Sequence, residues 1–277
     1  MPTTPVTVPA LQQMKRDGRK IAAVVCWDYQ MAQVADRAGV DIVSVGDTVG
    51  INLWGHDNPL QVTMDEMLIV AKAVRRGTKR ALVSVDFPFG PLQQGTDAAL
   101  AAALRFVKEA GVDMVKLDGA AAYPEAVAAI ARAGIPVFAQ FGITPQTALQ
   151  HGVDYKSTLK VGVTLPPAMT AQLVAQAKAL EAAGASLLDF THSGPVAGPA
   201  VTAAVGIPVL GGMGGGPWLD GRLRMIHAAL GYAASAIDAP QDTYAQLAKT
   251  ALEAFTAFAD DVRAGRQIKG GIPVRAD

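Results

Sequence analysis

Cysteine and charge are both scarce in this sequence. Cys26 is the only cysteine of the 277 residues, so no disulfide can form within the chain. Charged residues make up 17% of the sequence, and 24 Lys and Arg balance 24 Asp and Glu. A chain without strong net charge has little to attract nucleic acid or an anionic membrane. We therefore expect neither partner, and the lack of a disulfide framework favours a reduced, cytoplasmic location.

Long hydrophobic runs are also missing. No stretch reaches the ~18 apolar residues that suggest a membrane-spanning helix, and residues 1–10 carry Pro and Thr rather than a basic stretch followed by an apolar one. We therefore expect neither export nor a membrane span. What the sequence does contain is apolar side chains, at 51% of its residues. An α/β barrel uses ~250 residues as one unit, so a single domain over 1–277 with a C-terminal helix is predicted.

Short β-branched apolar runs alternate with longer Ala-rich segments of helical period, which is typical of parallel strands joined by helices. The predicted strands are Ile21–Cys26, Asp41–Gly46, Ala81–Asp86, Asp113–Leu117, Ile135–Gln140, Ser186–Thr191, Ile207–Gly211 and a weaker run at Gly231–Ile237. The predicted helices are Tyr29–Ala38, Met64–Arg76, Ala98–Ala110, Tyr123–Ala133, Pro167–Ala183, Pro195–Ala204, Asp220–Leu230 and Asp242–Ala264. This pattern favours a (β/α)8 TIM barrel. A doubly wound open sheet shows the same local pattern, and the eighth strand decides between them.

Carboxylates follow or end three successive predicted strands. Asp47 follows the second strand, Asp86 ends the third and Asp118 follows the fourth. Active sites of such barrels lie at the carboxyl ends of the strands, and like charges that meet there need a cation or a shared proton. Oxygen ligands favour a hard ion such as Mg²⁺. The alternative is that each Asp caps the helix that follows it.

Further polar features lie at the same ends. Lys116 and Asp118 alternate with Leu117 and therefore point to the same side of their strand. A lysine there would meet an anion, either a substrate or Asp118. The glycine run 211–216 could bind a phosphate or carboxylate through its backbone N–H groups, or could simply allow a tight turn. The stretch 150–167 is long enough for a loop or lid.

Several motifs recur in one order along most of the chain. They are VGDTVG (45–50), GHD (55–57), VTM (62–64), AVRRG (73–77), DFPF (86–89), MVK (114–116), GITPQ (142–146) and LEAAGA (180–185). In these motifs the sequence resembles the ketopantoate hydroxymethyltransferase family, which adds a hydroxymethyl group to 3-methyl-2-oxobutanoate in pantothenate synthesis. The resemblance implies a barrel of the phosphoenolpyruvate mutase and isocitrate lyase type. It also implies Mg²⁺, methylenetetrahydrofolate as co-substrate, a 2-oxo acid substrate and a homo-oligomer, a decamer.

The resemblance also implies roles for single residues. Asp47 and Asp86 match the metal ligands of the family, and Asp118 lies where the family has a glutamate near the metal. Thr48 and Lys116 match substrate-binding positions. A metal held by the carboxylate and ketone of the substrate would stabilise the enolate that forms when a neighbouring proton leaves. We therefore predict a metal at Asp47, Asp86 and Asp118, and substrate contacts from Asp47, Thr48, Asp86, Lys116, Gln140 and Thr191.

Two departures fall on the chemistry. Gln140 replaces a histidine of the family, and Thr191 replaces the glutamate expected to act as general base. Neither neutral side chain can take up a proton at neutral pH. Asp189 lies two positions before Thr191, on the same face and one layer deeper.

We predict that catalysis uses Lys116 with Asp189 as base or substrate clamp, and His192 as the second candidate base. The alternative for Asp189 is a structural pairing with a buried hydroxyl or backbone amide. Three functions stay open: the family's hydroxymethyl transfer, a related aldolase or lyase without folate, and a catalytically silent metabolite-binding barrel.

Overall fold

Eight parallel strands close into a barrel in the order β1 to β8, each pairing with the next. The structure is a computed structural model that describes residues 4–154, 165–239 and 242–271. The strands are β1 (Ile21–Val25), β2 (Ile42–Val45), β3 (Leu82–Asp86), β4 (Met114–Leu117), β5 (Val137–Gly142), β6 (Leu187–Thr191), β7 (Val209–Gly211) and β8 (Gly221–Met225). The closed sheet confirms the TIM-barrel prediction and rules out the doubly wound alternative.

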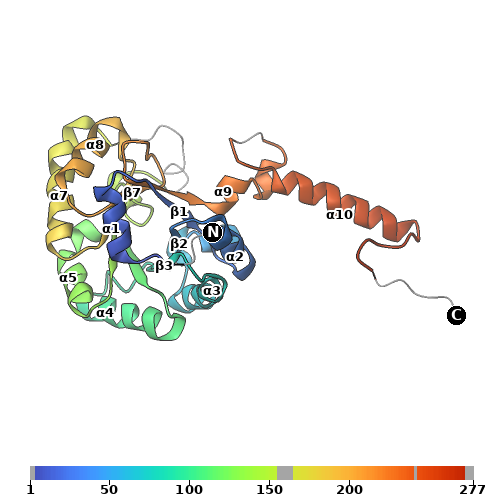
Figure 1. Ribbon diagram of the computed structural model, residues 1–277, viewed down its shortest axis with the longest axis horizontal. Coiled ribbons are helices and arrows are strands. Elements are labelled where there is room, and N and C mark those ends of the chain that lie inside the picture. The colour runs from blue at the N-terminus through green and yellow to red at the C-terminus, as the bar shows by residue number, and fades with distance from the viewer. Residues whose placement is uncertain (1–3, 155–164, 240–241, 272–277) are drawn as a thin grey trace. The chain divides into compact units, whose positions relative to one another are not determined.

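Helices form a ring outside the strands of the barrel, and α1 lies across one of its openings (Figure 1). The α-helices are α1 (Val8–Arg16), α2 (Tyr29–Ala38), α3 (Met64–Gly77), α4 (Thr96–Arg105), α5 (Pro124–Arg132), α7 (Thr170–Ala182), α8 (Gly194–Ala204), α9 (Ile226–Leu230) and α10 (Leu247–Arg263). Shorter helical turns are η1 (Gly50–Trp54), η2 (Pro59–Gln61), η3 (Phe106–Ala110), η4 (Ala120–Ala122), η5 (Ala148–His151), η6 (Pro167–Met169) and η7 (Ala234–Ala236).

Local sequence explains where several of these helices begin and end. Helix α3 starts at a capping box, in which the Thr63 hydroxyl accepts from the Glu66 N–H and the Glu66 carboxylate accepts from the Thr63 N–H. The side chain of Asp28 caps α2 by accepting from the Met31 N–H, and Gly39 ends that helix with a left-handed φ of 86°. The chain therefore turns back toward the next strand directly after the helix.

The two faces of the strands differ in composition. Valines such as Val43 and Val83 are fully buried and occupy the positions between inward-pointing side chains. Ser44 and Ser84 are paired in the β2–β3 register, and the Ser84 hydroxyl donates to the Ser44 hydroxyl at 2.8 Å. The interior of the barrel is therefore polar even below its mouth.

The eighth strand lies elsewhere than predicted. The prediction at Gly231–Ile237 is wrong, because β8 is Gly221–Met225, inside the segment predicted as a helix, and only Ile226–Leu230 of that segment is helical. Arg and Leu favour helices by propensity, yet burial alternates along β8, with Leu223 inside. Gly221 lets β8 pass close to β1, since a Cβ there would lie 2.3 Å from the Ile21 carbonyl oxygen.

The chain divides into two compact units, 1–224 and 225–277, so the prediction of one domain over 1–277 stays a prediction. In the second unit, α10 begins at Leu247 rather than at Asp242 and carries exposed apolar side chains such as Phe255. Most of the loop or lid predicted at 150–167 lies outside the described residues.

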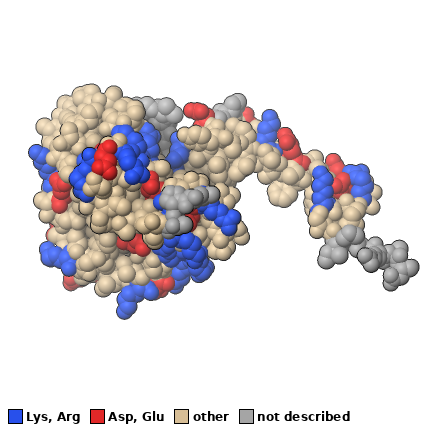
Figure 2. Space-filling model, viewed as in Figure 1, with Lys and Arg blue, Asp and Glu red and all other residues tan. Residues whose placement is uncertain are grey.

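Charge is spread over the visible surface. On the face in Figure 2, Lys and Arg side chains lie in several separate groups with Asp and Glu near them. None of the helices in the described ranges combines the length and apolar character that crossing a bilayer requires. The expectation that nucleic acid and membranes are not partners stays a prediction.

Candidate active site

Nine polar side chains predicted for the site are buried, and they lie in the last residues of neighbouring strands or directly after them. They are Asp47, Thr48, Asp86, Lys116, Asp118, Gln140, Asp189, Thr191 and His192, each with 9% or less of its surface exposed. Register brings Asp86 beside Lys116 and Gln140 beside Asp189. The strand-end prediction therefore gathers these residues correctly, and their contacts divide most of them into an acidic side and a lysine side.

On the acidic side, one glutamine links two of the three carboxylates. The Gln146 side-chain amide donates to Asp47 Oδ2 at 3.0 Å and to the Phe87 carbonyl at 3.0 Å. The backbone N–H of Gln146 donates to Asp118 Oδ2 at 3.3 Å. Sequence reasoning gave Gln146 no role, although it ends the GITPQ motif. Its place in that motif, shortly after the end of β5, is the feature of the sequence that points to a role in the site.

Burial raises the pKa of all three carboxyl groups. Loss of solvation, with the charges of Asp86 and Asp118 added to it, raises the pKa of Asp47 to about 8. Burial raises the pKa of Asp118 to about 7, although a hydrogen bond from Thr144 and the charge of Lys116 oppose the rise. The pKa of Asp86 is also raised by burial, against the attraction of Lys116. Burial therefore favours the protonated form of these carboxyl groups, and a bound cation would favour the ionised form.

The donor set fits a hard divalent metal ion. Thr48 Oγ1, Asp86 Oδ1 and Asp118 Oδ1 are buried, and none has a hydrogen-bond partner among the described residues. The described residues contain no group of three or more His, Cys, Asp or Glu side chains that could hold a metal ion without further ligands. Mg²⁺ usually takes one or two protein carboxylates and completes its shell with water and substrate oxygens. The residues thus suit an ion that is shared with a bound acid.

The helix-capping alternative for these aspartates is not observed. The elements that follow Asp47, Asp86 and Asp118 are η1, α4 and η4, and each begins without a capping side-chain hydrogen bond. The Asp118 carboxylate instead accepts from Gln146, which follows β5. The carboxylates therefore serve the barrel mouth and not their own helices.

On the lysine side, Lys116 is surrounded by oxygens of the protein. Its Nζ donates to Gln140 Oε1 at 2.6 Å and to Asp86 Oδ2 at 3.2 Å, and it forms an ion pair with Asp189 Oδ2 at 3.2 Å. The pairing with Asp118 that was considered from the sequence is replaced by pairings with Asp86 and Asp189. Burial lowers the pKa of Lys116, but the charges of Asp86 and Asp189 outweigh burial and raise it. The lysine is therefore charged.

The two departures from the family pattern touch each other. The side-chain amide of Gln140 donates to Thr191 Oγ1 at 3.0 Å while its carbonyl accepts from Lys116. Asp86, Lys116, Gln140 and Thr191 thus form one continuous network of hydrogen bonds, to which Asp189 is joined by its ion pair. The neutral Gln140–Thr191 pair binds the end of this network and offers no group that accepts a proton.

Asp189 differs from the structural pairing considered for it. Its Oδ2 contacts the Lys116 ammonium instead of a hydroxyl or an amide, and its buried Oδ1 has no hydrogen-bond partner within the described ranges. The side chain is 3% exposed. A buried carboxyl oxygen without a donor is a candidate to accept a proton or to bind a ligand.

His192 is positioned by its backbone. Its φ of 58° lies in the left-handed region, which is uncommon for a residue other than glycine. Its N–H donates to the Met213 carbonyl at 2.7 Å, and its carbonyl accepts from Leu165 at 2.9 Å. The histidine thus joins the loops after β5 and β7. Its predicted role as second base stays a prediction.

The glycine run after β7 makes a tight turn. A Cβ on Gly211 would lie 2.8 Å from the Phe190 carbonyl oxygen, and one on Gly215 would lie 2.8 Å from the Gly211 carbonyl oxygen. The Arg222 guanidinium donates to the Gly215 and Gly212 carbonyls. Close packing thus explains these two glycines, and binding of a phosphate or carboxylate to the run stays a prediction.

Comparison with known proteins gives a match along nearly the whole chain. The family model described as ketopantoate hydroxymethyltransferase matches residues 5–267. A relative from a Cyanothece species, named 3-methyl-2-oxobutanoate hydroxymethyltransferase, is 38% identical over 262 residues, covering 93% of this chain and 96% of its own. A protein of the same name from Salinibacter ruber is 38% identical over 258 residues, covering 93% and 95%.

Solved structures support the type of barrel. A crystal structure of 2,3-dimethylmalate lyase, described as a member of the PEP mutase/isocitrate lyase superfamily, matches with a TM-score of 0.61 and 15% identity, covering 97% of this chain and 92% of its own. Phosphonopyruvate hydrolase in complex with oxalate and Mg²⁺ matches with a TM-score of 0.59, 14% identity and the same coverages. At these identities the likeness shows the fold alone, and it confirms the predicted barrel type.

Proposed function

The chain belongs to the ketopantoate hydroxymethyltransferase family, and we propose that it is a Mg²⁺-dependent enzyme that adds a one-carbon unit to 3-methyl-2-oxobutanoate, giving ketopantoate for pantothenate biosynthesis. Methylenetetrahydrofolate would be the co-substrate that provides the one-carbon unit. The observation that carries the proposal is the set of buried carboxylates at Asp47 and Asp86, with Asp118 beside them, whose raised pKa values call for a cation.

Asp47 and Asp86 would hold the metal ion directly, with Asp118 supporting it. When bound, the ion supplies a Lewis acid for the ketone of the 2-oxo acid. Gln146 keeps Asp47 and Asp118 in place through one side chain and one backbone N–H. Thr48 Oγ1 is buried and has no hydrogen-bond partner among the described residues, so it is available to donate to the carboxylate of the substrate.

Asp189 is the group we assign to the proton transfer. The reaction removes the proton on C3 of the acid, and Asp189 Oδ1 would accept it. C3 would then bond to the one-carbon unit as the bond of that unit to the folate nitrogen breaks. Water would supply the new hydroxyl group, and tetrahydrofolate would leave. The Lys116 ammonium, 3.2 Å from Oδ2, holds the Asp189 side chain in place, and Oδ1 has no hydrogen-bond partner among the described residues. Gln140 and Thr191 would only orient the lysine and the bound acid, because both are neutral.

Lys116 fits a positioning role better than the direct substrate contact expected from the resemblance. An ammonium group has three donors, and three protein oxygens already lie within 3.2 Å of Nζ. These oxygens belong to Asp86 on the acidic side, and to Asp189 and the Gln140 amide on the lysine side. We infer that Lys116 keeps the carboxyl groups of Asp86 and Asp189 fixed relative to each other.

The decisive experiment follows the C3 proton of 3-methyl-2-oxobutanoate by NMR in D2O. We expect the purified protein to exchange this proton with Mg²⁺ present, and to form ketopantoate once methylenetetrahydrofolate or formaldehyde is added. Removal of the metal with EDTA should stop both reactions, and Asp86→Asn should do the same. Asp97→Asn, a change at an exposed carboxylate on α4, is the matched control. Absence of exchange in the metal-loaded protein would refute the proposal.

A second candidate function is cleavage of a different 2-oxo acid or related acid without folate. The neutral Gln140–Thr191 pair favours it, because the usual acid–base residues of the family are missing at both positions. A panel of branched 2-oxo and 2-hydroxy acids, assayed by NMR for carbon–carbon cleavage, separates this lyase from the transferase. A protein that binds these acids without exchange or cleavage would be the silent metabolite-binding barrel.

The assembly follows from the family resemblance, and the location follows from the single cysteine, which leaves no disulfide within the chain. We propose a cytoplasmic homo-oligomer, a decamer. Light scattering coupled to size-exclusion chromatography would measure the number of subunits, and a monomeric mass would contradict the assembly.

A further inference from the structure

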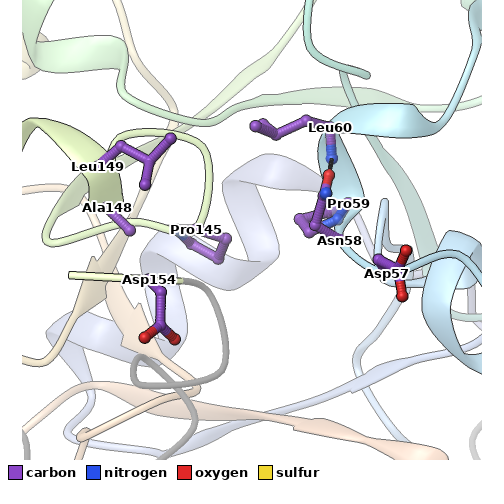
Figure 3. Close-up of a pocket in the computed structure, with 8 residues that line it drawn as sticks. All are labelled: Asp57, Asn58, Pro59, Leu60, Pro145, Ala148, Leu149 and Asp154. Carbon is purple, nitrogen blue, oxygen red and sulfur yellow. Dashed lines mark hydrogen bonds between the residues drawn. The ribbon is translucent and has the colours of Figure 1, made fainter.

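A cavity of about 280 Å³ opens beside the acidic side of the site. Figure 3 shows Asn58, Pro59 and Leu60 on one side of it and Pro145, Ala148 and Leu149 on the other. Asp57 and Asp154 also line the cavity, and the figure places them on opposite sides. The first group of residues belongs to the chain around η2, after β2, and the second to η5, after β5. Both loops leave the carboxyl ends of strands, so the cavity lies at the end of the barrel that holds the site.

The walls of the cavity are apolar and partly open. Pro59 and Ala148 are buried, whereas Leu149 is 73% exposed. A large apolar side chain that is exposed while it lines a cavity is typical of a surface that a ligand covers. The opposed carboxylates of Asp57 and Asp154 disfavour a phosphate or another anion and favour a ring that carries N–H donors.

The loop after β5 contributes both to the lining of the cavity and to the acidic side. Pro145 lines it, and the next residue, Gln146, donates to Asp47 and Asp118. A ligand seated against Pro145 would therefore lie next to the group that orients the carboxylates. Pockets for whole drug-sized ligands measure ~300–1,000 Å³. A cavity of about 280 Å³ therefore suits one ring system of a larger ligand rather than the whole molecule.

We propose that this cavity binds the amino-heterocyclic head group of the reduced folate that supplies the one-carbon unit. The apolar walls at Leu60 and Leu149 hold the faces of the bicyclic ring, and the carboxylates of Asp57 and Asp154 accept from its amino and ring N–H groups. The anionic tail lies outside, away from these carboxylates. The inference rests on the proposed function, because it assigns the binding site of the proposed co-substrate.

The test compares two one-carbon donors in one variant. Leu60→Ala/Leu149→Ala should raise the KM for methylenetetrahydrofolate by about tenfold, since two apolar contacts are shortened. The same variant should keep its KM for 3-methyl-2-oxobutanoate, its rate of C3 proton exchange and its rate with formaldehyde, because none of these uses the cavity. Leu104→Ala, at an exposed leucine on α4 that does not line the cavity, is the matched control and should change nothing.

Calorimetric titration with tetrahydrofolate provides a readout that needs no turnover. We expect wild type and Leu104→Ala to bind it alike, and Leu60→Ala/Leu149→Ala to bind it about tenfold more weakly. Equal affinity in all three proteins, or no binding by the wild type, would overturn the assignment of the cavity. Failure of the proposed function looks different, because C3 proton exchange would then be absent in the wild type whatever the titration shows.

Discussion

The two sides of the site treat buried charge differently. On β2 to β4, three carboxylates lie close together, and burial raises their pKa values. On β5 and β6, the only carboxylate is Asp189, which is paired with Lys116, and the residues above it are the neutral pair Gln140 and Thr191. The three carboxylates of the acidic side outnumber the one lysine near them and need a bound cation, whereas the single carboxylate of the lysine side is already paired with Lys116.

The difference shows that the charge of a buried lysine must be balanced by nearby carboxylates. Lys116 contacts a carboxylate from each side, Asp86 and Asp189, and both sides therefore share one ammonium group. Gln140 and Thr191 stand where the resemblance implies two ionisable groups, and Asp189 provides a carboxyl group 3.2 Å from the lysine. A site can thus change its acid–base residues as long as the charge around its buried cation stays compensated.

The largest expected effect comes from removing the cation that both sides share. Lys116→Met should reduce the free energy of unfolding by about 3–5 kcal/mol, because it leaves Asp86 and Asp189 buried without a positive partner. Urea denaturation at pH 8 measures the loss. Lys108→Met, at an exposed lysine on η3, should stay within about 0.5 kcal/mol of the wild type. Equal stability of the two variants would show that the ion pairs contribute little.

A substitution of Asp189, on the lysine side, should change the rate of C3 proton exchange. Asp189→Asn should slow exchange of the C3 proton by about 10²–10⁴-fold, with the KM for the acid little changed, because a base is lost and a binding group is not. Asp189→Glu, which keeps the carboxylate, should recover part of the rate. If Asp189 only balances Lys116, both variants should lose stability while exchange continues at the rate of the wild type.

The smallest expected effect concerns pH and belongs to the acidic side. Since the pKa of Asp47 is raised to about 8 and that of Asp118 to about 7, Mg²⁺ must displace protons in order to bind. Its affinity should rise by about tenfold per pH unit for each proton displaced, from pH 6 to 8, and level off above. Calorimetric titration with Mg²⁺ at several pH values measures this, and an affinity that does not change with pH would contradict it.

The same pKa shifts set the sign of a change in stability. Folded Asp47 and Asp118 keep protons that the unfolded chain releases above its pKa near 4. Their contribution to stability is therefore present at pH values below that pKa and is lost as pH rises through 7 and 8. The increase in melting temperature on adding Mg²⁺ should accordingly be larger at pH 8 than at pH 6.

Period-two alternation made much of the site predictable. Lys116 and Asp118 flank Leu117, and Asp189 and Thr191 flank Phe190, so their common direction follows from strand geometry alone. The carboxyl ends of parallel strands meet at one end of a barrel, and this places the three aspartates together. The eighth strand was missed because β8, with Arg222 and Leu223, consists largely of residues that also favour helices.

The sequence by itself determined seven strands and the polar residues at the strand ends, because alternation and strand-end position are local properties of a chain. Closure into a barrel rests on the tertiary structure, since an open sheet shows the same local pattern and the predicted eighth strand was wrong. Only the tertiary structure decided that Lys116 pairs with Asp86 and Asp189 rather than with Asp118, and that Gln146 links Asp47 to Asp118. These contacts join residues on different strands and loops. They depend on the stagger between strands and on the path of loops, which closure of the barrel sets and local sequence does not.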